Sequence, residues 1–300
     1  MHYQGLEGNQ VKLFWSQDYI GRKTGAETVN KSAWIVESLM RHPIDAVKIS
    51  TPRLLTEEQL LSAHSELYVR ALLTGMPEFL ADSGLPWDEH TWVNVRATNG
   101  GVVAAVREAI ATEVSGTLSS GLHHARHHTG VAFCSVNGLA IAAFDALADN
   151  LVDRVLILDV DGHGGGGTES IVRGDHRIMQ IDITTDEFDL PARSSRSWSF
   201  LPPEGSVAYL ATLSGALDRF IREVYEPKHR WVVIYNAGMD ADLNGFALAQ
   251  RETLVFEWAH RNKLPIAFTL AGGYLWDETR ESLVDKHRLT IAAASLRRTR

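Results

Sequence analysis

Two kinds of hydrophobic segment alternate along the chain. Short runs of branched apolar residues predict strands that are buried on both faces; they cover residues 11–15, 46–49, 155–158, 178–183, 231–236 and 266–270. Longer segments with apolar residues at helical spacing predict helices over residues 31–40, 56–74, 99–111, 136–149, 207–225, 251–261 and 282–296. Because strands alternate with helices and no linker or repeat intervenes, we expect one α/β domain over residues 1–300, a three-layer α/β/α arrangement with a mostly parallel central sheet.

The predicted strand at residues 155–158 runs directly into charged residues at alternate positions, Asp159, Asp161 and His163, and then into four glycines. Alternate residues of an extended chain point the same way, so Asp161 and His163 can reach one cation, with Asp159 behind them. The carboxyl ends of strands are where open α/β sheets bind ligands, and buried charges there are costly unless they are paired or metal-bound. A glycine-rich turn with incidental acids is the weaker interpretation, because the preceding strand pattern is clear.

Two further predicted strands end in polar residues beside glycines. One is followed by Asp240 and the other by Tyr274. A single Asp or Tyr after a strand is usually a loop residue, but three such strand ends indicate a shared site. The loop at residues 119–129 adds a histidine cluster, and taken alone this cluster fits a buried site and a surface metal-binding accident equally well; its members are His123, His124, His127 and His128.

Composition narrows the class of protein. The 300 residues carry a net charge of -8, which argues against direct nucleic-acid binding because a phosphate backbone favours a basic surface. The one cysteine, Cys134, excludes an internal disulfide, lies in an apolar run and suits a reducing cytosol. Residues 1–8 lack the features of a signal peptide, and no apolar run reaches the roughly 18 residues of a membrane span, so we predict a cytoplasmic protein.

Taken together, these motifs resemble the zinc-dependent histone deacetylase superfamily, which has the arginase–deacetylase fold, and in particular its divergent bacterial-type members. Five motifs in the family's order are far more specific than any one of them. They span nearly the whole chain: Gly121-Leu122-His123-His124-Ala125, Phe133-Cys134-Ser135-Val136-Asn137, Asp159-Val160-Asp161-Gly162-His163, Ala237-Gly238-Met239-Asp240 and Gly272-Gly273-Tyr274.

The resemblance implies a role for each polar residue of these motifs. Asp161, His163 and Asp240 would ligate one zinc ion and leave positions open for water and a substrate carbonyl; the donor types alone also suit iron(II) or manganese. Asp159 would orient His123 and lie near K⁺ or another monovalent cation. Of the two tandem histidines, His124 would be the general base, and Tyr274 would donate a hydrogen bond to the developing oxyanion.

The implied reaction is hydrolysis of an amide. The expected substrate is an acylated amine, such as acetyl-lysine, an acetylpolyamine or a specialised metabolite. Phe133 would form one wall of a narrow acyl-amine tunnel, and Phe188 and Trp198, from the loop at residues 186–200, are candidates for the opposite wall. The sequence leaves open whether the chain forms a homo-oligomer.

The chain departs from the family pattern around its glycines. Gly164 stands where a second histidine is usual, and Gly166 stands where an Asn or Asp normally supports the second tandem histidine. We therefore expect His124 to lack a partner, unless another acid such as Glu169 substitutes. Asp182 falls near a position that is often a serine at the monovalent-cation site.

Two other functions compete with the hydrolase. An arginase-like ureohydrolase with two manganese ions would need an Asp-x-His-x-Asp order, whereas this chain has Asp159, Asp161 and His163 in that order, with glycine at 165. A non-catalytic or acyl-transferring relative that binds acylated ligands is the second alternative. Its support is the missing partner of His124.

Overall fold

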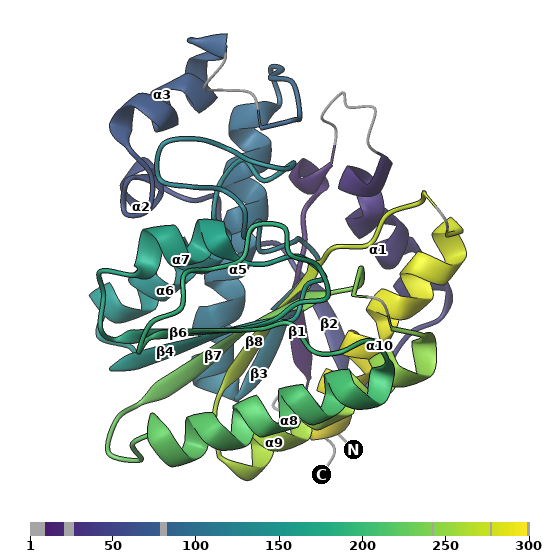
Figure 1. Cartoon of the computed structure of the whole chain (residues 1–300). Coiled ribbons are helices and arrows are strands. Elements are labelled where there is room, and N and C mark those ends of the chain that lie inside the picture. Colours follow the sequence, from purple (N-terminus) through teal and green to yellow (C-terminus); the bar gives the residue numbers. More distant parts are fainter. Residues whose placement is uncertain (1–9, 21–26, 79–82, 242, 277, 299–300) are drawn as a thin grey trace, which may run out of the picture.

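The strands form one sheet in which every neighbouring pair is parallel, in the order β2-β1-β3-β8-β7-β4-β5-β6 (Figure 1). The computed structural model describes residues 10–20, 27–78, 83–241, 243–276 and 278–298, so residues 1–8, over which we expect no signal peptide, lie outside it. The predicted α/β class is confirmed, and the sheet is wholly rather than mostly parallel. Its strands are β1 (Val11–Phe14), β2 (Val47–Ser50), β3 (Val114–Thr117), β4 (Arg154–Asp159), β5 (Ile178–Ile183), β6 (Ser197–Phe200), β7 (Trp231–Gly238) and β8 (Ile266–Ala271).

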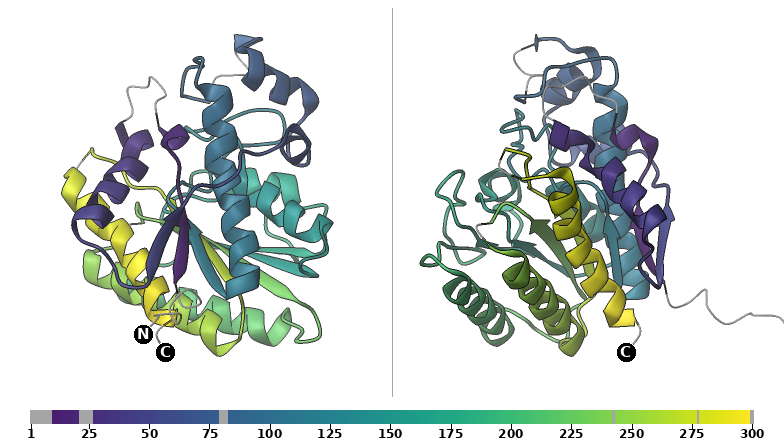
Figure 2. Two further views of the ribbon diagram at one scale, coloured as in Figure 1. Left: turned by 180° about the vertical axis from the view of Figure 1, so that it is seen from behind. Right: turned by 90° about the vertical axis from the view of Figure 1, so that its right-hand side faces the viewer.

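Helices cover both faces of the sheet, which gives the three layers that the sequence predicts (Figures 1 and 2). One face packs against α1 (Lys31–Arg41), α8 (Ser206–Glu223), α9 (Gly245–Arg261) and α10 (Arg280–Arg298). The other packs against α5 (Thr91–Thr112) and α6 (Gly138–Ala148). No described helix combines the length and apolar character needed to cross a membrane.

Strand β4 shows why the sheet is recognisable from sequence. Leu156 and Leu158 pack into the core on the side of α8 and α9, whereas Val155 and Ile157 pack into the core under α5 and α6. All four side chains are buried. A strand covered on both faces needs apolar residues at every position, so it appears as a continuous apolar run and not as an alternating one.

Three elements escape prediction because their residues carry no clear hydrophobic pattern: strands β3 and β6, and helix α7 (Gly166–Val172). Strand β3 reads Val-Ser-Gly-Thr, and its Gly116 makes room for Phe268, whose ring would lie 2.3 Å from a Cβ at that position. Strand β6, predicted as loop, pairs with β5 at the edge of the sheet.

The single helix expected over residues 56–74 is two helices, α2 (Glu57–Leu61) and α3 (Glu66–Thr74). Ser65 caps α3, since its side chain accepts a hydrogen bond from the Tyr68 N–H. His64 lies between the helices, where its Nδ1 is 2.9 Å from the Arg126 carbonyl oxygen and its Nε2 accepts from the Asn137 N–H. The histidine therefore joins this segment to the histidine-rich loop.

A buried ion pair in α9 is bonded to the end of β7. The Arg251 guanidinium donates to Glu252 Oε1 at 2.7 Å and to the Gly238 carbonyl oxygen at 2.7 Å, and both side chains are fully buried. We expect Arg251→Met to lower the free energy of unfolding by about 3–5 kcal/mol, because it leaves the Glu252 carboxylate buried without its counter-charge. Urea unfolding followed by circular dichroism measures this.

The matched control is Lys228→Gln, which removes an exposed ion pair with Glu226. This variant should unfold at nearly the wild-type urea concentration, because exposed pairs contribute little. Equal stability of the two variants would contradict the role given to Arg251.

Candidate active site

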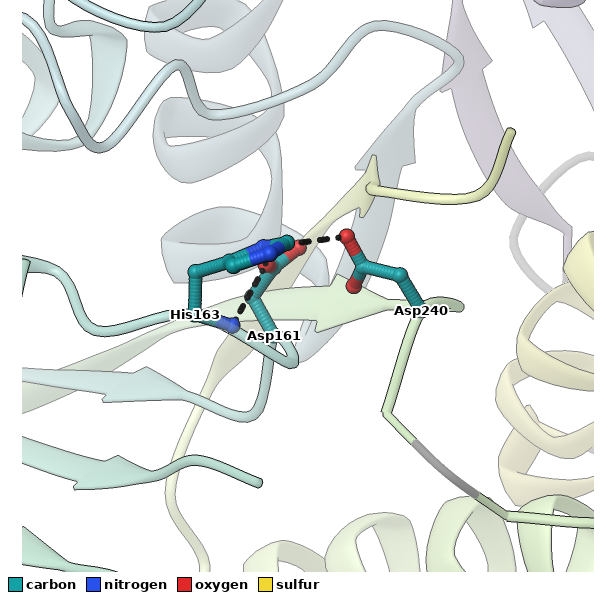
Figure 3. Close-up of side chains that lie close together, drawn as sticks. All are labelled: Asp161, His163 and Asp240. Carbon is teal, nitrogen blue, oxygen red and sulfur yellow. Dashed lines mark hydrogen bonds and ion pairs between the residues drawn. The ribbon is translucent and has the colours of Figure 1, made fainter. Parts of the chain in front are cut away.

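Three potential metal ligands meet where two neighbouring strands end. Asp161 and His163 follow β4, and Asp240 follows β7, which pairs with β4 so that Asp159 lies opposite Asn236. Figure 3 shows the three side chains pointing toward one another. The Nδ1 atom of His163 lies 3.3 Å from Asp161 Oδ1 and 3.4 Å from Asp240 Oδ2, and one ligand atom from each residue lies within 4.8 Å of the others.

The surroundings of this trio fit a divalent cation. Asp240 Oδ2 is buried and accepts no hydrogen bond. Gly272 leaves space beside the carboxylates, since a Cβ there would lie 2.3 Å from Asp240 Oδ1 and 2.7 Å from Asp161 Oδ2. The hydrogen bond from the His163 ring to Asp161 and its ion-pair contact with Asp240 raise the pKa of His163 to about 10, so a proton balances the carboxylates when no cation does. Two carboxylates and one imidazole are a donor set that zinc accepts.

The first tandem histidine is held by Asp159. The Nδ1 of His123 lies 2.7 Å from Asp159 Oδ2, while Asp159 Oδ1 accepts from the Asn236 side-chain amide at 2.9 Å and from the Asp161 N–H at 3.1 Å. Burial alone would lower the pKa of His123, but Asp159 and Asp161 outweigh it and raise the pKa to about 10. The two carboxylates therefore favour the protonated form of His123.

The second tandem histidine has a partner: another acid does substitute for the missing one, as the sequence left open, but it is Asp189 and not Glu169. The Nδ1 of His124 lies 2.8 Å from Oδ2 of Asp189, a residue in the loop between β5 and β6. Glu169, the substitute that the sequence suggested, pairs with Arg173 at 2.8 Å instead. Asp189 escaped prediction because it lies 65 positions from His124, and only the unusual glycines at 164 and 166 hinted that another segment fills their place.

The pKa values of the two adjacent histidines, His123 and His124, shift in opposite directions. Burial and the positive charge of His123 lower the pKa of His124, and the bond to Asp189 opposes this without reversing it. A carboxylate can only accept, so a neutral His124 carries its proton on Nδ1 and keeps a lone pair on Nε2. This is the form that a general base requires.

A cavity in front of the tandem histidines brings most of the remaining predicted residues together. His123, His124, Phe133, Asp161 and Tyr274 all line it. The ring of Phe133 lies 6.5 Å from that of Tyr274. Burial, together with the charges of Asp240 and Asp161, raises the pKa of Tyr274, so its hydroxyl stays protonated and can donate.

Of the two residues predicted for the opposite wall, Phe188 lies beside the site and Trp198 does not. The Phe188 ring lies 5.2 Å from the His124 ring and 5.9 Å from the His163 ring, beside the site. Trp198 is not brought there: it is buried in β6 as part of the hydrophobic core, with the Arg219 guanidinium 4.1 Å from its ring centre. Its place in the sheet was missed because β6 was predicted as loop.

Lys31 is a further cavity residue that the sequence did not single out. It begins α1, is buried, and donates to the Gly272 carbonyl oxygen. Burial lowers the pKa of Lys31 to about 8, against the opposing charges of Asp240 and Asp161. A lysine in a helical segment carries no pattern that would reveal its burial.

His127, a member of the predicted histidine cluster, is exposed and lies 2.8 Å from the Ala63 carbonyl oxygen.

Comparison with known proteins finds similar sequences over most of this chain. A probable deacetylase of Methanothermobacter thermautotrophicus is 30% identical over 248 residues, which cover 72% of this chain and 71% of that protein. An uncharacterized protein of Picosynechococcus sp. is 29% identical over 265 residues, 84% of this chain and 86% of its own.

The fold agrees as well. The structure of acetylpolyamine aminohydrolase from Burkholderia pseudomallei matches with a TM-score of 0.74 at 19% identity, over 95% of this chain and 98% of that chain. The model of the histone deacetylase domain matches residues 26–197, more than half of the sequence. The chain therefore belongs to the histone deacetylase domain family.

Proposed function

We propose that this protein is a zinc-dependent amidohydrolase that removes an acyl group, most simply acetyl, from an amine. The observation that carries the proposal is that one cavity is lined by three kinds of group: Asp161, which belongs to the ligand set with His163 and Asp240, the base His124, and the protonated hydroxyl of Tyr274. Each supplies what amide hydrolysis needs, namely an electrophile site, a base and an oxyanion donor.

A zinc ion held by the ligand set would polarise the acyl carbonyl and lower the pKa of a water molecule. His124 accepts the proton of the attacking water at Nε2, while its Nδ1 proton remains on the bond to Asp189. Asp159 fixes the His123 ring at 2.7 Å and raises its pKa, which favours negative charge beside this ring. The Tyr274 hydroxyl donates to the oxygen that becomes negative, and the proton taken up by His124 passes to the departing amine nitrogen.

The amine is proposed from the walls of the cavity. Phe133 and Phe188 are both partly exposed aromatic residues beside the site, which suits the aliphatic stem of a lysine side chain or a polyamine. The acetylpolyamine aminohydrolase named above shares the fold, which supports an amine of this class. A monovalent cation near Asp159 stays a prediction.

The competing functions have less support. The partner that His124 finds in Asp189 removes the argument for a non-catalytic or acyl-transferring relative. A two-manganese ureohydrolase would need a carboxylate where this chain has Gly165, whose added Cβ would lie 2.8 Å from Asp182 Oδ1.

Zinc uptake tests the ligand set directly. Titration of the metal-free protein with zinc in a calorimeter at pH 7.5 should show about one ion bound per chain and about one proton released, because a ligating histidine must be neutral. Protons are released and not taken up, because the pKa of His163, about 10, keeps this residue protonated until zinc binds. Asp240→Asn should weaken binding at least about tenfold, whereas Asp186→Asn, on an exposed loop residue, should not. Equal zinc affinity of the two variants would contradict the site.

Turnover tests the proposed roles. On an acetyl-lysine fluorogenic peptide or acetylated polyamines, His124→Ala should lower kcat by about 10²- to 10⁴-fold, through loss of the base. Tyr274→Phe should lower it by about 10²- to 10³-fold, through loss of one oxyanion donor. Both should keep wild-type zinc content. The control is His127→Ala, an exposed histidine of the same loop. Bound zinc without turnover on either substrate would argue against a lysine or polyamine deacetylase.

A further inference from the structure

We propose that Asp189 is the positioning residue of His124, and that Gly164 and Gly166 are small because the loop carrying Asp189 occupies their side-chain space. The inference rests on the proposed function, since it names the group that holds the base of that reaction. The carboxylate that orients the base thus comes from the loop between β5 and β6 and not from the glycine-rich segment after β4.

The carboxylate of Asp189 is fully engaged at the site. Oδ2 lies 2.8 Å from His124 Nδ1 and accepts the Gly167 N–H at 3.2 Å, while Oδ1 pairs with the Arg126 guanidinium. The side chain is nearly buried, at 5% exposure. Bonds from two directions fix the plane of the carboxylate, and this plane fixes the imidazole.

Two backbone hydrogen bonds join the loop to the glycine segment. The Gly164 N–H donates to the Phe188 carbonyl oxygen at 2.9 Å, and the Gly166 N–H donates to the Asp189 carbonyl oxygen at 2.8 Å. Asp189 itself has a φ of +53°, a left-handed conformation that non-glycine residues adopt seldom and aspartate tolerates better than most. The conformation is thus held by the bonds around it.

Side chains at the two glycines are incompatible with this arrangement. A Cβ on Gly164 would lie 2.5 Å from the Asp189 carbonyl oxygen, and a Cβ on Gly166 would lie 2.5 Å from Asp189 Oδ1. Both distances are far below contact, so a larger residue would displace the loop. The position of Asp189 therefore requires glycine at residues 164 and 166.

The same loop also carries Phe188, whose ring lies 5.2 Å from the His124 ring. One loop therefore supplies an aromatic wall of the cavity and, at the next residue, the acceptor for the base. Displacement of the loop would disturb both at once, whereas removal of the Asp189 carboxylate alone should disturb only the base. This difference makes the proposal testable.

The experiment compares Asp189→Ala and Asp189→Asn with Glu169→Gln, each measured for kcat, KM, zinc content and thermal midpoint. Glu169, in α7, is the matched control because it is a buried acid that pairs with Arg173 and not with His124. We expect Asp189→Ala to lower kcat by about 10- to 100-fold, with KM and zinc content unchanged. Asp189→Asn keeps an acceptor oxygen and should lose less, and Glu169→Gln should keep wild-type kcat.

A second measurement does not depend on turnover. In protein labelled with ¹⁵N-histidine, the His124 signals, assigned with His124→Gln, should show a proton on Nδ1 in the wild type. In Asp189→Ala this proton should exchange rapidly with water and its signal should be lost, while the His123 signals stay in place. Gly166→Ala should reproduce the loss although Asp189 is present.

The outcomes separate the two proposals. An unchanged His124 Nδ1 proton signal in Asp189→Ala, or a loss of kcat in Glu169→Gln that matches the loss in Asp189→Ala, would overturn the role of Asp189. A wild type that turns over no acylated amine would overturn the proposed function, while the nitrogen signals would still decide whether Asp189 holds His124.

Discussion

The structure depends on how negative charge is balanced where β4 and β7 end. Asp159, Asp161 and Asp240 lie at this edge of the sheet, and the first two are almost completely buried. Carboxylates removed from water are costly unless other charges or hydrogen bonds compensate them. The imidazoles of His123 and His163, the Asn236 amide and several backbone N–H groups provide that compensation. Parallel pairing of β4 with β7 is what brings the charges and their partners to one place.

This balance also explains why neighbouring histidines behave differently. His123 and His124 are adjacent in the chain, and their ring centres lie only 3.9 Å apart. Asp159 and Asp161 raise the pKa of His123, and a positive charge on His123 in turn lowers the pKa of His124. One cluster of acids thus shifts the pKa values of two adjacent histidines in opposite directions. Perturbed pKa values of this kind are typical of catalytic sites.

Much of this arrangement could be predicted from the sequence, because it is encoded locally. Six of the eight strands, and the alternate spacing of Asp159, Asp161 and His163, follow from patterns within a few residues. The parts that escaped prediction depend on contacts between distant segments. Strand β3 is stabilised by neighbours on both sides and not by its own hydrophobicity, and Trp198 belongs to the core only because β6 joins the sheet edge.

The placement of Asp189 has the same origin and a wider consequence. A sequence motif that requires an acid three positions after His163 finds Gly166 there, and this chain would be classified as lacking the acid that supports the base. The acid is present, but it is Asp189 in the loop after β5, outside the sequence motif that contains His163. In relatives of this kind, loss of a side chain at one position of a linear signature does not by itself mean loss of the interaction. In this chain, a substitution at residue 166 and a substitution at residue 189 would act on one and the same interaction.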